Sequence, residues 1–290
     1  MAYRTPDDRF TDLPDFPYEP HYLEHDGLRI AYLDEGPKDG PAVWLMHGEP
    51  TWSFLYRKVM GPLLEAGFRC LVPDLVGFGR SDKPEAIEDY TYEKHVGWMS
   101  AVVDHLAPTD CTMVVHDWGG PIGMRLFVEH PDAFSRIAIM DTGFFTGEQR
   151  MSDAWKAFRD FTERTEDLPI GFLVNGGAKS ELPPEVIAAY DAPFPEPAAK
   201  AGARAFPLMI PTSPDAVGAD AGRALRDAMI ADDRAKLQLW ADGDPIIPMA
   251  AGEKIAELLG APIEPVADAS HFLQEDAGAA IGARLVSWLS

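Results

Sequence analysis

The feature that most constrains the fold of this chain is a regular alternation of short apolar runs with longer segments of helical pattern. The apolar runs lie at 28–34, 42–46, 69–73, 112–116, 136–140 and 235–240. One helix-length segment separates most of them; residues 52–66, for example, carry apolar side chains at near-helical spacing and end at Gly67. This alternation is typical of βαβ units, so we expect an α/β fold with a mostly parallel central sheet flanked by helices.

The alternation stops between residues 142 and 225. Helix-like patches such as SDAWKAFRDFTER are interrupted there by proline-containing stretches such as SELPPEV and DAPFPEPA. The strand pattern returns only at 235, and a helical pattern at about 276–289 ends the chain. We therefore expect residues 142–225 to form a helical cap inserted in a core domain made of residues 1–141 and 226–290.

The charge balance excludes one class of partner. The 290 residues include 25 Lys and Arg against 47 Asp and Glu, a formal net charge of -22. A surface of this charge repels nucleic acid and anionic membranes, so we expect neither as a partner. The opening MAYRTPDDRF lacks the apolar core of a signal peptide, and no run approaches the roughly 20 apolar residues of a membrane span. We expect a cytoplasmic protein.

Residues of catalytic type lie where predicted strands end. Asp117 directly follows the run 112–116, Asp244 comes shortly after 235–240, and His271 lies near the C-terminus. In open α/β sheets, ligands bind at the carboxyl ends of the strands. The order nucleophile, acid, histidine is that of α/β-hydrolase triads, whose nucleophile lies on a tight turn between a strand and a helix. Asp117, which two glycines follow after Trp118, is therefore the candidate nucleophile.

An aspartate at the nucleophile position determines which reaction can be completed. A serine that displaced a leaving group from an alkyl carbon would become an ether, which histidine and water cannot hydrolyse. A carboxylate instead forms an ester, and activated water can attack the carbonyl carbon of that ester. Asp117 therefore indicates substitution at an sp³ carbon.

Five segments carry a resemblance to a known family. They are HGEPTWSFLYRK at 47–58, DLVGFGRSDKP at 74–84, VVHDWGG at 114–120, AAYDAPFP at 188–195 and DASHFLQE at 268–275. Together, and over nearly the whole chain, they resemble the haloalkane dehalogenases of the α/β-hydrolase superfamily. The resemblance implies an α/β-hydrolase fold with an inserted cap.

The resemblance also implies a two-step hydrolysis to a primary alcohol, halide and a proton. Asp117 would attack the carbon that bears the halogen, and the halide would leave toward the indole N–H of Trp118. His271, oriented by Asp244, would then activate water against the alkyl ester. Backbone N–H groups of Glu49 and Trp118 would form the oxyanion hole.

The partners implied are a small hydrophobic halogenated substrate and a halide ion. No cofactor and no metal are implied, and the sequence contains no phosphate-binding loop or metal-ligand cluster. We expect a monomer or weak homodimer.

The resemblance does not identify a second residue that donates a hydrogen bond to the halide. An early cap helix would supply a second indole at the place that Phe158 occupies in SDAWKAFRDF, whereas the tryptophan, Trp155, lies three residues earlier. Residues three apart share a helix face, so Trp155 is the candidate for this role. The alternative is that Trp155 only packs the cap against the core.

Three further alternatives remain open. Asp141, at the end of the run 136–140, could be the catalytic acid in place of Asp244. It could instead be a carboxylate that only caps the end of an element. An epoxide hydrolase would also use an elbow aspartate but would need two cap tyrosines, and residues 142–225 contain only Tyr190. A protein that binds small hydrophobic ligands without catalysis is the third, although all three triad residue types are present.

Overall fold

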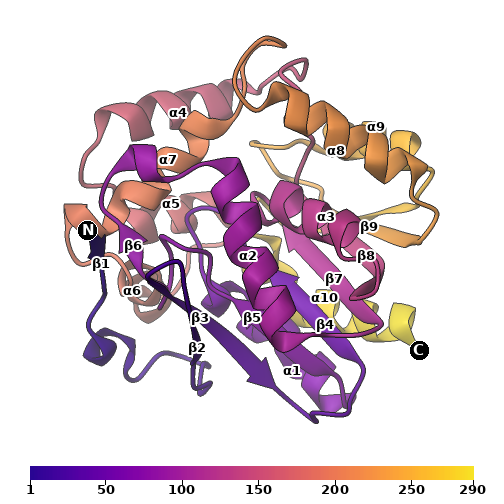
Figure 1. The fold of residues 1–290 in the computed structure, drawn as a ribbon, viewed down its shortest axis with the longest axis horizontal. Helices are drawn as coiled ribbons and strands as arrows, with labels where there is room; N and C mark the ends of the chain where they lie inside the picture. Colours follow the sequence, from indigo (N-terminus) through magenta and orange to yellow (C-terminus); the bar gives the residue numbers. More distant parts are fainter.

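The computed structural model describes residues 1–290, and an eight-stranded sheet lies at its centre (Figure 1). In spatial order the strands are β10 (Ile263–Val266), β9 (Ala235–Ala241), β8 (Phe134–Met140), β7 (Cys111–His116), β4 (Ala42–Met46), β5 (Arg69–Pro73), β3 (Leu28–Glu35) and β2 (His21–His25). Neighbours from β10 to β5 pair in parallel, whereas β3 pairs antiparallel with both β2 and β5. The expected α/β class with a mostly parallel sheet is confirmed.

Every predicted run lies within one of these strands, but the sequence pattern missed the two edge strands β2 and β10. Side chains of β2 and β10 are all exposed or half-buried, so neither strand forms an apolar run. The predicted helix at 52–66 is also divided, because Ser53–Tyr56 form a 3₁₀ turn before α1 (Arg57–Glu65) begins. Four short elements complete the core. Strand β1 (Ala2–Tyr3) pairs with β6 (Lys83–Pro84), and 3₁₀ turns lie at Asp7–Phe10 and Ile87–Asp89.

Helices cover both faces of the sheet and close a separate apolar core on each. Alternate residues of β4 illustrate the division: Trp44 belongs to one core cluster and Val43 to the other. The first cluster is closed by α2 (Tyr92–Leu106), α3 (Gly119–Glu129), α8 (Ala219–Ala231) and α9 (Met249–Leu259), and the second by α1 and α10 (Leu273–Leu289). This burial of both faces explains why the central strands read as continuous apolar runs.

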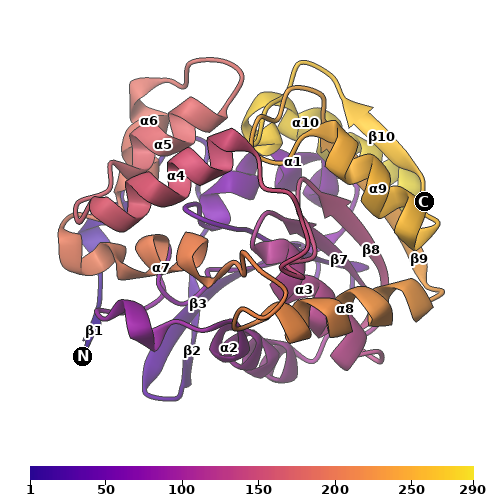
Figure 2. The same ribbon diagram turned by 90° about the horizontal axis from the view of Figure 1, so that it is seen from above.

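Between β8 and β9 the chain forms only helices. These are α4 (Asp153–Arg164), α5 (Ile170–Gly177), α6 (Pro184–Asp191), a 3₁₀ turn at Pro197–Lys200, α7 (Ala201–Met209) and α8. In both ribbon views α4 to α7 lie together, away from α8 and α9 (Figures 1 and 2). Helix α8 continues past residue 225 and packs against α3 and α9, so the cap boundaries of 142–225 stay a prediction. None of the helices has both the length and the apolar character needed to cross a bilayer.

The turn from β7 to α3 is tight. Asp117 adopts a left-handed backbone conformation with φ 49°, and the N–H of Gly120 donates to its carbonyl at 2.8 Å. A Cβ atom on Gly119 would overlap the carbonyl oxygens of Met46 and His47 at the end of β4. The turn therefore requires glycine at residue 119, where the start of α3 passes against a neighbouring strand.

We predict that Gly119→Ala lowers the free energy of unfolding by about 1–3 kcal/mol, because the new methyl group meets rigid backbone. The measurement is chemical denaturation monitored by circular dichroism. The control is Gly97→Ala in the middle of α2, where the glycine is exposed and a Cβ atom would meet no heavy atom within 4 Å. This control should be stabilised by roughly 0.5–1 kcal/mol. Equal unfolding energies for the two variants would contradict the prediction.

Candidate active site

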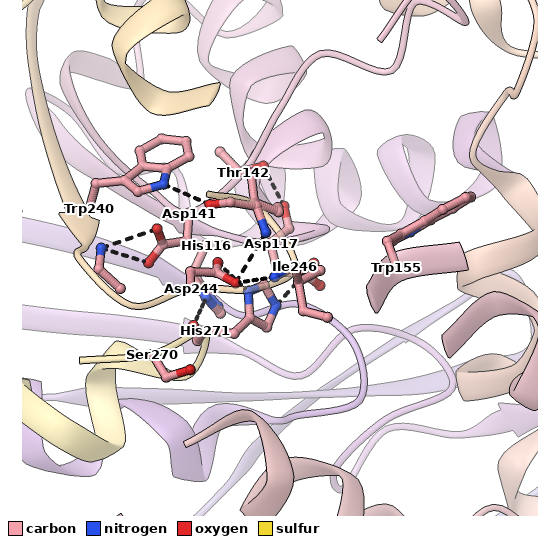
Figure 3. Close-up of polar contacts among 12 residues, drawn as sticks. His116, Asp117, Asp141, Thr142, Trp155, Trp240, Asp244, Ile246, Ser270 and His271 are labelled. Atoms are coloured by element: carbon pink, nitrogen blue, oxygen red, sulfur yellow. Dashed lines mark hydrogen bonds and ion pairs between the residues drawn. The ribbon is translucent and has the colours of Figure 1, made fainter. Parts of the chain in front are cut away.

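The three predicted triad residues meet at the carboxyl end of the sheet (Figure 3). Asp117 follows β7, Asp244 follows β9, and His271 precedes α10. The Nδ1 atom of His271 lies 2.8 Å from Oδ2 of Asp244, and its Nε2 atom lies 3.6 Å from Oδ2 of Asp117. One imidazole therefore stands between two carboxylates, all three groups being largely withdrawn from solvent.

The carboxyl group of Asp117 is held by backbone as well as by histidine. The N–H of Glu49 donates to Oδ1 of Asp117 at 2.8 Å. Burial alone would raise the pKa of Asp117, but the hydrogen bond and charge of His271, with a smaller contribution from the N–H of Trp118, bring that pKa below its ordinary value. Asp117 is therefore an ionised carboxylate, and the two N–H groups expected in the oxyanion hole are the ones that contact it.

The two candidate acids differ in what they contact. Oδ1 of Asp244 accepts the N–H groups of Ile246 at 2.6 Å and Ile247 at 3.1 Å, which leaves Oδ2 for His271. Burial opposes ionisation of Asp244, but the charge of His271 and these hydrogen bonds lower its pKa. Asp141 instead accepts the N–H of Ala241 at 3.2 Å and makes no hydrogen bond to His271.

The charge state of Asp141 follows from its surroundings. Burial and the negative charge of Asp244 raise the pKa of Asp141 well above its ordinary value. The surroundings therefore favour the uncharged form of Asp141, whose carboxyl oxygens accept the N–H of Ala241 in β9. The geometry favours Asp244 as the partner of the histidine.

His271 is set up to carry a positive charge in the free protein. Burial would lower its pKa, but the charge of Asp244, the hydrogen bond to Asp244 and the charge of Asp117 raise the pKa well above the usual value. A second histidine supports the loop: Nε2 of His116 lies 2.8 Å from the carbonyl oxygen of His271. Burial lowers the pKa of His116 to about 4, so His116 is neutral and donates to this carbonyl.

A cavity of about 260 Å³ opens onto the triad. Eight of its sixteen lining residues are hydrophobic, and several come from the cap helices. The cap contributes Trp155, Phe158, Phe172, Leu173, Pro207 and Ile210, and the core contributes Glu49, Asp117, Trp118 and His271 among others. A small apolar ligand could therefore reach Asp117 in surroundings from which most water is excluded.

The two candidate halide-binding tryptophans both line this cavity but are placed differently. Trp118 directly follows Asp117, whereas Trp155 lies one turn before Phe158 on the same helix. Both indoles are buried, with 4% and 6% of their surfaces exposed. In Figure 3 the ring of Trp155 extends away from Asp117 and His271. The structure therefore brings Trp118 to the triad, and Trp155 only to the cavity wall.

Comparisons with known proteins identify relatives of this chain. The sequence model of the alpha/beta hydrolase fold family matches residues 41–169. Haloalkane dehalogenase 1 from Mycobacterium tuberculosis is 45% identical over 98% of this chain and 97% of its own length, and a haloalkane dehalogenase from Psychrobacter cryohalolentis is 40% identical over 99% and 97%. A haloalkane dehalogenase from Paraglaciecola agarilytica, solved as a tetramer, superposes with a TM-score of 0.90 at 35% identity, covering 98% of this chain and 97% of that one.

The chain belongs to the haloalkane dehalogenase family. The members of this family are hydrolases that act on carbon–halogen bonds. The expected α/β-hydrolase fold is confirmed, and a solved member of the family matches this chain over nearly its whole length.

Sequence reasoning on this dehalogenase family member missed one group of site residues. Helix α5 contributes a wall of the cavity that includes Phe172 and Leu173. This wall lies in the stretch IGFLVNGG, for which the sequence predicts only that it belongs to the cap. Its run of apolar residues after Pro169 was the available signal. The sequence also does not predict that the side chain of Glu49 lines the cavity, because the resemblance assigns a role only to the backbone N–H of this residue.

We predict that Asp244→Asn lowers the pKa of His271 by about 1–3 pH units, because a hydrogen-bonded carboxylate is removed. Asp141→Asn should change that pKa much less, since Asp141 bonds the N–H of Ala241 and makes no hydrogen bond to His271. The measurement is an NMR titration of the His271 imidazole in each variant. A larger effect of Asp141→Asn would move the acid to Asp141.

Proposed function

We propose that the protein hydrolyses small haloalkanes to primary alcohol, halide and a proton through an alkyl ester on Asp117. The observation that carries this proposal is an ionised elbow aspartate that faces a histidine–aspartate pair inside an apolar cavity. Halide is a weak base and leaves without being protonated, so the first step requires a nucleophile and a dry site but no acid. No metal or cofactor takes part in this reaction.

In the first step a carboxylate oxygen of Asp117 forms a bond to the carbon as the carbon–halogen bond breaks. The halide departs with the bonding electron pair toward the indole N–H of Trp118. This indole N–H makes no hydrogen bond within the protein, and it is free to donate to the halide.

In the second step His271 takes a proton from water, and the oxygen of that water attacks the ester carbonyl of Asp117. Esterification removes the charge of Asp117, one of the two anions that raise the pKa of His271. With the ester formed, the imidazolium releases its proton to solvent and the neutral imidazole can act as the base. Asp244 stabilises the imidazolium that forms again when water gives up its proton. The N–H groups of Glu49 and Trp118 stabilise the tetrahedral oxyanion, where one donor contributes about 3 kcal/mol. The intermediate collapses as the bond between the carbonyl carbon and the alkoxy oxygen breaks; the departing oxygen takes the proton of the added hydroxyl to give the alcohol, and Asp117 is left as a carboxylate.

The structure gives less support to the two alternative functions, an epoxide hydrolase and a ligand-binding protein without catalysis. An epoxide hydrolase requires cap tyrosines in the cavity, but the hydroxyl of Tyr190 donates to Oε1 of Glu275 at 2.5 Å and Tyr190 does not line the cavity. A protein that only binds hydrophobic ligands has no need of three aligned ionisable groups. The monomer or weak homodimer stays a prediction, and the Paraglaciecola relative is a tetramer.

We predict that the purified protein releases bromide from 1-bromobutane and that EDTA leaves the rate unchanged. A panel that also contains styrene oxide and a p-nitrophenyl ester, with bromide, diol and nitrophenol measured separately, tests the reaction class. Bromide release with little turnover of the other two substrates is the expected result. Turnover of the epoxide by a folded protein that releases no bromide would overturn the proposal.

Trp155 is the second halide donor that we propose from the sequence, and its indole must rotate or α4 must shift for its N–H to reach the halide. Trp155→Phe retains most of the packing and removes the donor, so we predict that bromoalkane turnover and bromide affinity fall about tenfold or more. Trp118→Phe serves as the comparison and should abolish both. Unchanged turnover and affinity in Trp155→Phe would show that Trp155 only packs the cap.

A further inference from the structure

The backbone on both sides of His271 is held by hydrogen bonds from outside its own loop. The N–H of Ser270, which lies beside the triad in Figure 3, donates to Oδ2 of Asp276 at 2.9 Å. The N–H of Phe272 donates to the carbonyl oxygen of Gly177, at the end of α5, at 3.2 Å. The residue before the histidine is therefore held by a side chain, and the residue after it by the backbone of the cap.

Asp276 joins the histidine loop to the cap. Its carboxylate also accepts the N–H of Lys179, at 2.9 Å to Oδ1 and 3.0 Å to Oδ2. Lys179 lies 97 positions earlier in the chain, in the segment that connects α5 to α6. An aspartate that only caps a helix accepts N–H groups of that helix, whereas Asp276 accepts one from the loop before α10 and one from the cap.

The backbone of the cap comes close to the loop because residue 177 is a glycine. A Cβ atom on Gly177 would lie 2.5 Å from the ring of Phe272. This distance is shorter than van der Waals contact, so a larger residue would push the cap and the loop apart. The bridge through Asp276 therefore spans two segments that are already packed against each other.

The turn that follows His271 is not continuous with the rest of α10. The backbone leaves the helical conformation at Ala277, where φ is −133° and ψ is 22°. The first four residues of α10 thus form a short turn whose position the long helix does not fix. Glu275 in this turn pairs with Arg57 of α1 and anchors the turn to the core, and Asp276 anchors it to the cap.

We propose that Asp276 is a positioning residue, which ties the His271 loop to the cap and so keeps the imidazole against Asp244 and aimed at the ester. This inference rests on the proposed function. Asp276 acts through the backbone of Ser270 and contacts no reacting atom. Only the second step uses the histidine as a base, whereas the first step requires Asp117 alone. Loss of the bridge should therefore slow hydrolysis of the ester and leave its formation unchanged.

The test compares Asp276→Ala and Asp276→Asn with 1-bromobutane as the substrate. Alanine removes both acceptor oxygens, whereas asparagine loses the same charge but keeps an oxygen that can accept the N–H of Ser270. We expect kcat to fall about tenfold in the alanine variant, because a small misplacement of the base is costly. In the asparagine variant kcat should stay within about threefold of wild type. Bromide release in a single turnover, and with it kcat/KM, should be unchanged in both, so KM should fall together with kcat.

A second measurement does not depend on turnover. The charge and hydrogen bond of Asp244 raise the pKa of His271, so an imidazole that moves away from Asp244 should have a lower pKa. In NMR titrations the pKa of His271 should fall in Asp276→Ala and stay near the wild-type value in Asp276→Asn. The control is Asp268→Asn, which removes an exposed carboxylate of the same loop that makes no side-chain hydrogen bond. This control should change neither kcat nor the pKa of His271.

Three outcomes would overturn the inference: a wild-type kcat in Asp276→Ala, equal shifts of the His271 pKa in the alanine and asparagine variants, or a single-turnover rate that falls as much as kcat. The second would show an effect of charge alone, and the third a general loss of structure. If Asp276→Ala kept its kcat while wild type hydrolysed 1-bromobutane, this inference would fail and the proposed function would stand. If wild type released no bromide, the proposed function would fail, and the pKa of His271 in the two variants would still decide whether Asp276 positions the loop.

Discussion

The contact on which the rest of the site depends is the placement of one buried imidazole between the carboxylates of Asp117 and Asp244. Burying three ionisable groups is costly unless they compensate one another, and here each carboxylate is stabilised by the histidine and by backbone N–H groups. The same arrangement has two states. In the mechanism that we propose, the histidine is held charged while both anions are present, and it becomes a base once Asp117 is esterified.

The fold supplies the two conditions that this arrangement requires. The parallel strands β7 and β9 end at the same edge of the sheet. Carboxylates more than a hundred positions apart in sequence therefore lie 3.6 Å (Asp117) and 2.8 Å (Asp244) from the two ring nitrogens of one histidine. The helices α4, α5 and α7 then cover that edge with apolar side chains and form the cavity. A site with these properties suits a reaction in which charge moves from a carboxylate to a departing halide in the near absence of water.

Much of this could be predicted from the sequence, and the failures have physical causes. The central strands are buried on both faces and read as apolar runs, whereas β2 and β10 are partly exposed edge strands without that pattern. The order of Asp117, Asp244 and His271 identified the triad candidates, but only the structure shows that Asp244 contacts the imidazole and Asp141 does not. The direction of the Trp155 ring and the free Oε1 of Glu49 depend on side-chain packing, which no local pattern encodes.

The most direct test of the account is intact-protein mass spectrometry of His271→Phe after incubation with 1-bromobutane. This variant keeps the nucleophile and lacks the base, so the account predicts that one butyl group accumulates on the protein and that peptide mapping places it on Asp117. A butyl group on any other residue, or its absence under conditions in which wild type releases bromide, would contradict the assignment of Asp117 as the nucleophile.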